Sequence, residues 1–302
     1  MTYRPKFSMG GVLGLLFILL VLAVDVLLVR ALIVHSIRPQ QINLITFLIG
    51  LVVIASLPVL VVAAYETLSW FSLRYHLDRN GIAIRWAGIE QIIPLHDVQR
   101  ILPGGQLTET MVKRHGIHWP GHERGEGDVP GIGHTRLLST QPSAGQLLII
   151  TPGEAFAISP RDPDGFIRGF EARRAMGPNR LLERELRLAP WRQLSLWTDQ
   201  TAWVLLGVAL AVNVGLFGYL AARFPGLDHQ LPLHFNNLGQ PDRIGTKTEL
   251  FALPIIGLII LGTNLALGLL LYRRERAGSY LLWGAAAAAQ ALFWLATFSI
   301  VP

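Results

Sequence analysis

In the stretch LDRNGIAIRW, residues 77–86, the turn residues DRNG at 78–81 are followed by an alternation of large apolar side chains with smaller or polar ones. Its Asn-Gly pair at 80–81 is a strong hairpin signal, because both residues tolerate a positive φ. Beyond the turn, Ile82, Ile84 and Trp86 lie on one side of the chain. The stretch therefore predicts two antiparallel strands joined by a tight turn, with one face of the second strand buried.

This hairpin lies in a polar block, Phe71 to Arg192, which carries most of the Lys and Arg residues. Strand spacing recurs at 90–95, 136–139, 146–151 and 154–159, and residues 104–133 predict a long polar loop. The period then changes to that of a helix: Asp162 can cap it, Pro163 suits its first position, and Phe166 and Phe170 share a face. Strands followed by one amphipathic helix predict a small β domain whose end the helix covers.

Long apolar runs flank the block. The chain has 302 residues, of which 51% are apolar and 15% are charged, against roughly 25% charged in an average soluble domain. Five runs are long enough to cross a bilayer, which takes about 20 residues: 10–33, 42–64, 202–222, 250–272 and 279–301. The predicted fold class is therefore an α+β membrane protein with about five transmembrane helices. The chain contains no Cys, which excludes disulfides and thiolate chemistry.

Charge predicts the orientation. Arg4, Lys6, the polar block and the basic turn at 273–276 fall on one side of a five-span arrangement, whereas Arg38, Arg243 and Lys247 fall on the other. The bias of Lys and Arg toward the cytoplasm places the N-terminus and the β domain inside a cell membrane and the C-terminus outside. The net charge of +6 is explained in this way, and nucleic acid is not an expected partner.

The β block resembles the bacterial pleckstrin-homology-like (PH-like) domains over roughly 75–175. The resemblance is carried by the stretches 75–77, 81–84, 93–98, 147–151 and 157–166. It implies a PH-like β-barrel closed by a C-terminal helix. It does not imply a phosphoinositide ligand, because the basic strand-loop cluster of inositol-phosphate-binding relatives is absent from the sequence.

The loop LPLHFNNLGQPDRIGTK, residues 231–247, resembles a second family, the domain of unknown function DUF1648 of bacterial multi-span proteins. That group includes immunity proteins against a sporulation-delay toxin. The positions that carry the resemblance are His234, Phe235, Asn236, Gly239, Pro241, Asp242, Gly245 and Lys247. The predicted organisation is two spans in 1–69, the PH-like domain in 70–178, a basic juxtamembrane linker in 179–199, and three spans in 200–302 with the DUF1648-like loop at 224–248.

This loop has two interpretations. In the first, it recognises a ligand outside the cell, with Asp242 and Lys247 paired and His234 as a ligand contact. In the second, its side chains bond to the backbone and tie the neighbouring spans together, as Asn and Asp commonly do at turns. No Ser or Cys nucleophile lies beside the set, so we expect no catalysis there.

Asp25 is an acid deep within a predicted span, and intramembrane charges are functional candidates. A small ion-coupled transporter would use it together with the other intramembrane polar residues, Asn213, Asn264 and Gln290. The alternative is a hydrogen bond within the bundle, or a pair with Arg30.

His115, His118 and His122 could ligate a metal, since imidazole suits zinc, and would support a metal-dependent membrane hydrolase. Gly116 and Pro120 argue against a helix that would align them, so we expect no metal and no cofactor.

A run of arginines faces the lipid in this interpretation: Arg173, Arg174, Arg180, Arg184, Arg187 and Arg192. Basic residues near the surface attract anionic lipids. The expected partners are the bilayer with its anionic headgroups, and a protein or peptide that the sequence does not identify. The leading hypothesis is a sensing, scaffolding or immunity-type membrane protein that is not an enzyme.

Overall fold

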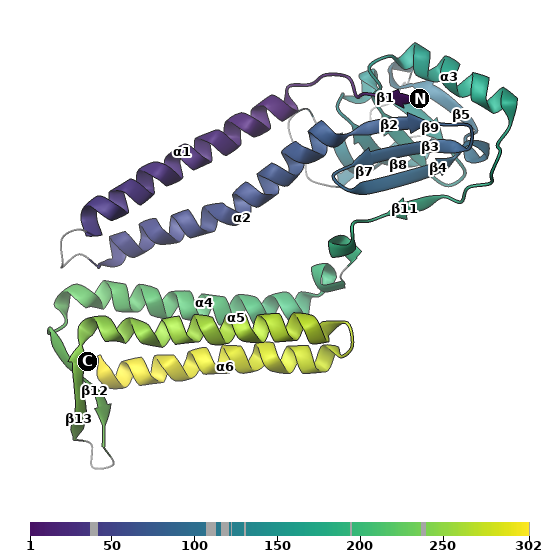
Figure 1. The fold of residues 1–302 in the computed structure, drawn as a ribbon. Coiled ribbons are helices and arrows are strands. Elements are labelled where there is room, and N and C mark those ends of the chain that lie inside the picture. Colours follow the sequence, from purple (N-terminus) through teal and green to yellow (C-terminus); the bar gives the residue numbers. More distant parts are fainter. Residues whose placement is uncertain are drawn as a thin grey trace. The chain divides into compact units, whose positions relative to one another are not determined.

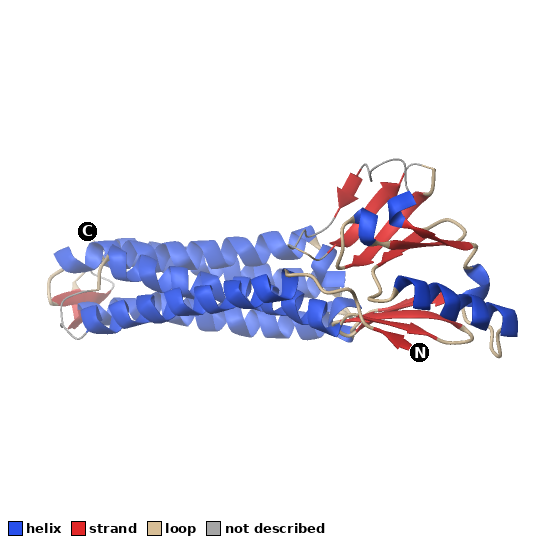
Figure 2. Ribbon diagram, turned by 90° about the horizontal axis from the view of Figure 1, so that it is seen from above, coloured by secondary structure: helices blue, strands red, loops and turns tan. Residues whose placement is uncertain are grey.

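The computed structural model describes residues 1–36, 42–106, 113–115, 121, 123–129, 131–193, 195–236 and 240–301. The chain divides into two compact units, one made of 1–23 and 56–193 and the other of 24–55 and 194–302. Figures 1 and 2 show the helices and strands. The helices are α1 (Gly10–Ser36), α2 (Leu44–Ser72), α3 (Pro163–Met176), α4 (Gln200–Arg223), α5 (Ala252–Tyr272) and α6 (Arg276–Ile300).

The first unit contains two β-sheets. Sheet one has the order β1-β2-β3-β4-β11, and sheet two has the order β5-β9-β10-β8-β7-β6. Within sheet two, β8 and β10 run parallel. The strands are β1 (Thr2–Tyr3), β2 (Arg74–Leu77), β3 (Gly81–Trp86), β4 (Ile89–Pro94), β5 (Arg100–Pro103), β6 (Lys113–His115), β7 (Glu123–Val129), β8 (Gly133–Ser139), β9 (Leu147–Ile150), β10 (Ala155–Ile158) and β11 (Glu185–Arg187).

The two sheets are not closed into the predicted barrel. The physical reason is visible at their edges: β11 pairs with β4 and β6 pairs with β7. Each of these strands extends its own sheet and satisfies backbone groups that would otherwise be available for pairing across to the other sheet. The α+β class and the flanking apolar helices are as predicted.

The inner faces of both sheets share one apolar core, which includes Tyr75, Ile84, Ile149 and Phe156. Helix α3 adds Phe166 and Phe170 to it, and Asp162 caps the helix by accepting a hydrogen bond from the Gly165 amide at 2.9 Å. Burial raises the pKa of Tyr75 to about 12, and its hydroxyl donates to the Leu138 carbonyl at 2.9 Å. The phenol is therefore neutral and joins the two sheets across the core.

The hairpin at 77–86 is present, but its turn differs from the prediction. Asp78 accepts hydrogen bonds from the amides of Asn80 and Gly81 at 2.7 and 2.8 Å, so its side chain builds the turn. A Cβ on Gly81 would lie 2.7 Å from the Ile93 carbonyl oxygen. Glycine is needed there because β3 and β4 approach closely, and not because of a positive φ.

The chain before the first span is part of the β domain. Thr2 and Tyr3 pair with His76 and Tyr75 in β2, and the N-terminal amino group donates to the Leu77 carbonyl at 2.8 Å. The Tyr3 hydroxyl donates to the Gly165 carbonyl at 3.0 Å. The first unit thus holds the chain on both sides of the α1–α2 segment.

Several strands lie where no strand was predicted, among them β7 and β11 of the first unit. β7 falls within the predicted loop 104–133 and pairs with β8 along its whole length. β11 falls within the predicted linker 179–199 and pairs with β4, with Leu186 opposite Gln91. Both belong to the folded domain.

In the second unit, α4, α5 and α6 lie side by side (Figure 1), and the hairpin of β12 (Gln230–Phe235) and β13 (Pro241–Thr246) connects α4 to α5. Five helices in the described residues are long and apolar enough to cross a membrane. They are Gly10–Val34, Leu44–Ser72, Gln200–Gly226, Lys247–Tyr272 and Arg276–Ile300. The chain is a multi-span membrane protein.

Candidate functional site

The β12–β13 hairpin exposes a contact between a histidine and an aspartate. His234 on β12 lies with its Nδ1 2.5 Å from Oδ1 of Asp242 on β13. The side chains are 67% and 43% exposed, so both remain accessible to a partner. A register shift between Pro232 and His234 bends the strand locally. The predicted partner of Asp242 was Lys247, and the structure pairs it with His234 instead.

Lys247 holds the base of the hairpin. Its ammonium group donates to the carbonyls of Phe224 and Leu227, each at 3.1 Å, and lies 4.6 Å from the centre of the Phe224 ring. These carbonyls follow the end of α4, where backbone acceptors lack helical donors and a cation is favoured. Lys247 therefore ties the hairpin to α4.

Other residues of the motif also shape the hairpin. The Asn236 side chain accepts from the Gln240 amide at 2.9 Å, and a Cβ on Gly245 would overlap Leu233 and Glu249. Pro241 begins β13. Gly239 lies outside the described residues, and so does the side chain of Phe235.

Two of the four intramembrane polar residues meet. Asn213 of α4 donates to the Gln290 side chain of α6 at 2.9 Å and to the Pro254 carbonyl of α5 at 3.0 Å. Gln290 in turn donates to the Gly257 carbonyl at 2.8 Å. Both side chains are fully buried. This interhelical polar cluster joins the three helices of the second unit.

The other two intramembrane residues lie elsewhere. The Asn264 side chain donates to the Ile260 carbonyl of its own helix at 3.0 Å. Asp25 lies half-buried on α1. The structure therefore assigns a packing role to Asn213 and Gln290.

The predicted lipid-facing arginines divide into two groups. Arg184 forms ion pairs with Asp97 and Glu154, at 3.0 and 3.3 Å, and Arg187 pairs with Glu90 and Glu185, at 3.3 and 2.9 Å. These two stabilise the β domain. In the second group, the guanidinium of Arg173 donates to Gly169 and that of Arg174 to Gln99, both at backbone carbonyls; Arg180 is exposed, and the side chain of Arg192 lies outside the described residues.

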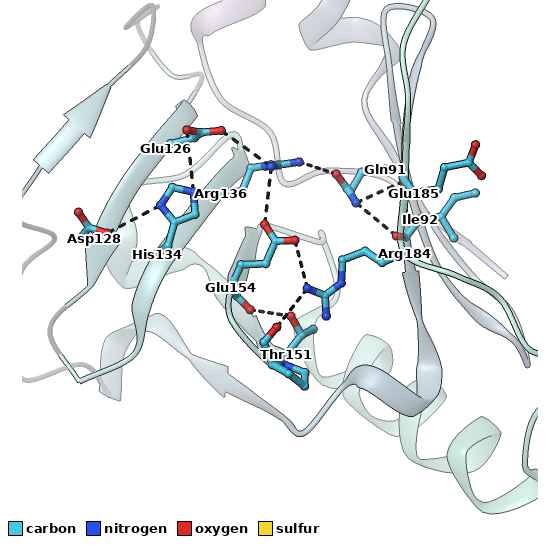
Figure 3. A network of polar contacts seen from close by, with 11 residues as sticks. Gln91, Ile92, Glu126, Asp128, His134, Arg136, Thr151, Glu154, Arg184 and Glu185 are labelled. Atoms are coloured by element: carbon cyan, nitrogen blue, oxygen red, sulfur yellow. Dashed lines mark hydrogen bonds and ion pairs between the residues drawn. The ribbon is translucent and has the colours of Figure 1, made fainter.

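A polar network that the sequence did not predict lies between the sheets (Figure 3). Arg136 on β8 donates to Gln91 on β4 at 2.7 Å and lies 3.6 Å from the carboxylate of Glu154. Glu154 also pairs with Arg184, and Gln91 donates to the Glu185 carbonyl at 3.4 Å. Where the two sheets are not joined by backbone hydrogen bonds, this network of side chains connects β8 of sheet two to β4 of sheet one.

A signal for this network exists in the sequence. Gln91 falls in phase with Ile89 and Ile93, at a position that strand alternation assigns to the core. A polar residue at such a position needs a buried partner. Its partner Arg136 lies 45 positions away, and local periodicity does not identify it.

The three histidines of the candidate metal site lie outside the part of the chain whose side chains are described. His118 and His122 are not described, and neither is the side chain of His115 on β6. Among the residues that are described, no group of three or more His, Cys, Asp or Glu side chains is placed to hold a metal ion.

Comparison with known families agrees with both sequence resemblances. Residues 73–174 match the bacterial PH domain family, and residues 211–258 match a domain of unknown function, DUF1648. Membrane-spanning helices flank the matched segments. No curated protein and no solved structure matches the chain.

Proposed function

We propose that this protein is a non-catalytic sensing, scaffolding or immunity-type membrane protein. The β12–β13 hairpin recognises a protein or peptide partner, and the PH-like domain serves as the docking module on the opposite face of the membrane. The observation that carries the proposal is that some residues of the hairpin motif make internal contacts while others are exposed to a partner. Asn236 and Lys247 are engaged internally, whereas the His234–Asp242 pair is exposed.

The chemistry of the hairpin supports binding over catalysis. Residues 224–249 contain no Ser or Cys. The Thr246 hydroxyl takes part in a capping box with Glu249 at the start of the following helix. An acid, a base and an exposed strand surface suit recognition of a polar peptide.

Topology is the first test, and the Cys-free chain suits it. Single substitutions at exposed positions, Ala144→Cys in the PH-like domain and Asp228→Cys beside the hairpin, are labelled with a membrane-impermeant maleimide in intact cells and after lysis. We expect Asp228→Cys to react in intact cells and Ala144→Cys to react only after lysis. Labelling of both from the same side would contradict the proposal.

Recognition is tested with a photocrosslinking amino acid at Ile244, which is 65% exposed on β13, in the native membrane. We expect an adduct of discrete mass that disappears when His234→Ala is added. An adduct that His234→Ala leaves unchanged would show that the exposed pair has no part in binding.

A further inference from the structure

A basic pocket opens beside the spans of the first unit. It has a volume of about 450 Å³ and is lined by Arg4, Pro5, Lys6, Phe7, Trp70, Phe71, Arg74 and Arg161. Ligand pockets in proteins typically span roughly 300–1,000 Å³. None of the arginines predicted to face lipid belongs to it.

The backbone of the N-terminal segment is held in place. The Lys6 amide donates to the Ser159 carbonyl at 2.7 Å, and the Arg161 amide donates to the Arg4 carbonyl at 2.9 Å. The Thr140 hydroxyl donates to the Lys6 carbonyl at 2.6 Å. These bonds fix the segment, and the pocket forms around its side chains.

The pocket concentrates positive charge. Four of its eight lining residues are Arg or Lys and none is acidic. Within the described part of the chain, none of these four side chains forms an ion pair. One Nη of Arg74 donates to the carbonyls of Phe71 and Leu73, at 2.8 and 2.6 Å. The remaining N–H donors of that guanidinium are available to a ligand.

The aromatic wall suits the membrane interface. Phe7 and Phe71 are 68% and 43% exposed, and the Trp70 indole donates to the Ser8 hydroxyl at 2.9 Å. A Cβ on Gly11 would lie 2.5 Å from the Trp70 ring, so the first turn of α1 packs directly on it. Aromatic side chains with one apolar and one polar edge favour the headgroup level of a bilayer.

The location of the pocket at the ends of two candidate spans indicates the class of ligand. The pocket lies where α1 begins and α2 ends, and both helices are candidate spans. Leu13 and Leu68, near these helix ends, are 41% and 60% exposed. A ligand with a phosphate and attached acyl chains would place the phosphate among the cations and the chains along these apolar surfaces. We propose that this pocket binds the headgroup of an anionic phospholipid.

The test uses the full-length protein in detergent, titrated with phosphatidylglycerol or phosphatidylcholine and followed by native mass spectrometry. We expect one phosphatidylglycerol to bind at a lower concentration than phosphatidylcholine. The double variant Arg4→Gln/Arg161→Gln should weaken phosphatidylglycerol binding by roughly 10- to 30-fold, given the usual attraction per near-surface charge.

A matched control removes the same charge elsewhere. Arg100→Gln/Arg168→Gln changes two exposed arginines of the same domain outside the pocket, and we expect it to bind phosphatidylglycerol as the unmodified protein does. Equal loss in both double variants, or no preference for phosphatidylglycerol in the unmodified protein, would overturn the proposal. Displacement of the lipid by an equal concentration of inorganic phosphate would show a site for free anions and overturn it as well.

Discussion

Glu66 of α2 and Arg124 of β7 form an ion pair at 3.3 Å whose side chains are only 6% and 17% exposed. Arg124 also lies over the ring of Tyr65, 5.7 Å from its centre. The pair joins the end of a candidate span to sheet two of the PH-like domain. Since the N-terminal strand joins the other sheet, both sheets are connected to the chain near the first two spans.

Glu66→Gln should destabilise the first unit strongly. Removal of one partner leaves a half-buried guanidinium without its counter-charge, so the cost should approach the roughly 3–5 kcal/mol of a broken, fully buried pair. Thermal unfolding in micelles, followed by the circular dichroism of the sheets, measures the effect. The control is Arg85→Gln, which breaks a pair with Glu90 whose arginine is 57% exposed and should cost at most about 1 kcal/mol. Equal effects of the two variants would refute a buried pair.

Gly257→Ala should weaken the three-helix bundle. The added Cβ would lie 2.6 Å from the Asn213 amide nitrogen and would overlap the Gln290 side chain, so we expect a loss of about 1–3 kcal/mol. Gly262→Ala on the same helix is the matched control, because a Cβ there meets nothing within 4 Å. It should be neutral or stabilise the bundle slightly. Resistance to unfolding in denaturing detergent distinguishes them, and a Gly257→Ala variant as stable as Gly262→Ala would argue against the interhelical polar cluster.

Acidification should loosen the N-terminal strand through His76. Burial, followed by the charges of Arg85 and the N-terminus, lowers the pKa of His76 below its ordinary value of 6.5, and its Nδ1 lies 2.9 Å from the Thr2 hydroxyl. The folded state favours the neutral ring. The stability that neutral His76 contributes is therefore fully present above pH 6.5 and is lost as the pH falls through the lowered pKa.

We therefore expect the unfolding temperature to fall between neutral and mildly acidic pH, and to fall less in His76→Gln. A pH dependence identical in both proteins would assign it to other groups.

Asp199 should stabilise the second unit in its ionised form. Hydrogen bonds from the Tyr272 and Tyr280 hydroxyls, both at 2.5 Å, and from backbone amides lower the pKa of Asp199 to about 2, from 3.8. Because the pKa of this carboxyl is lower in the folded protein than in the unfolded chain, the ionised group stabilises the fold at pH values above the unfolded-state pKa. That stability is lost as the pH falls from about 4 towards 2.

Asp199→Asn should thus be less stable than the unmodified protein at neutral pH, with a difference that shrinks in acid. Unfolding in micelles at several pH values measures this, with the exposed Asp164→Asn as control. A constant difference across the pH range would contradict the role of the charge.

Sequence patterns of short range predicted the local elements well. Asp162, Pro163 and Phe166 are a cap, a first-turn residue and a core residue of α3, as their spacing indicates. The motif at 231–247 predicted a polar loop between two spans, and the structure shows that this connection forms the two strands of the β12–β13 hairpin. Its internal pairing was not predictable, because Lys247 bonds to the carbonyls of Phe224 and Leu227, and carbonyls carry no sequence signal.

The sequence by itself determined the apolar spans, the helix α3 and the strands β2, β3, β4, β8, β9 and β10, because these depend on hydrophobic period and on capping residues close in the chain. Only the tertiary structure decided that Thr2 pairs with His76, that β11 pairs with β4, and that Arg136 meets Gln91 between two open sheets. Such contacts join distant segments through backbone groups that every residue possesses. Their formation depends on how the whole domain packs, so no local pattern encodes them.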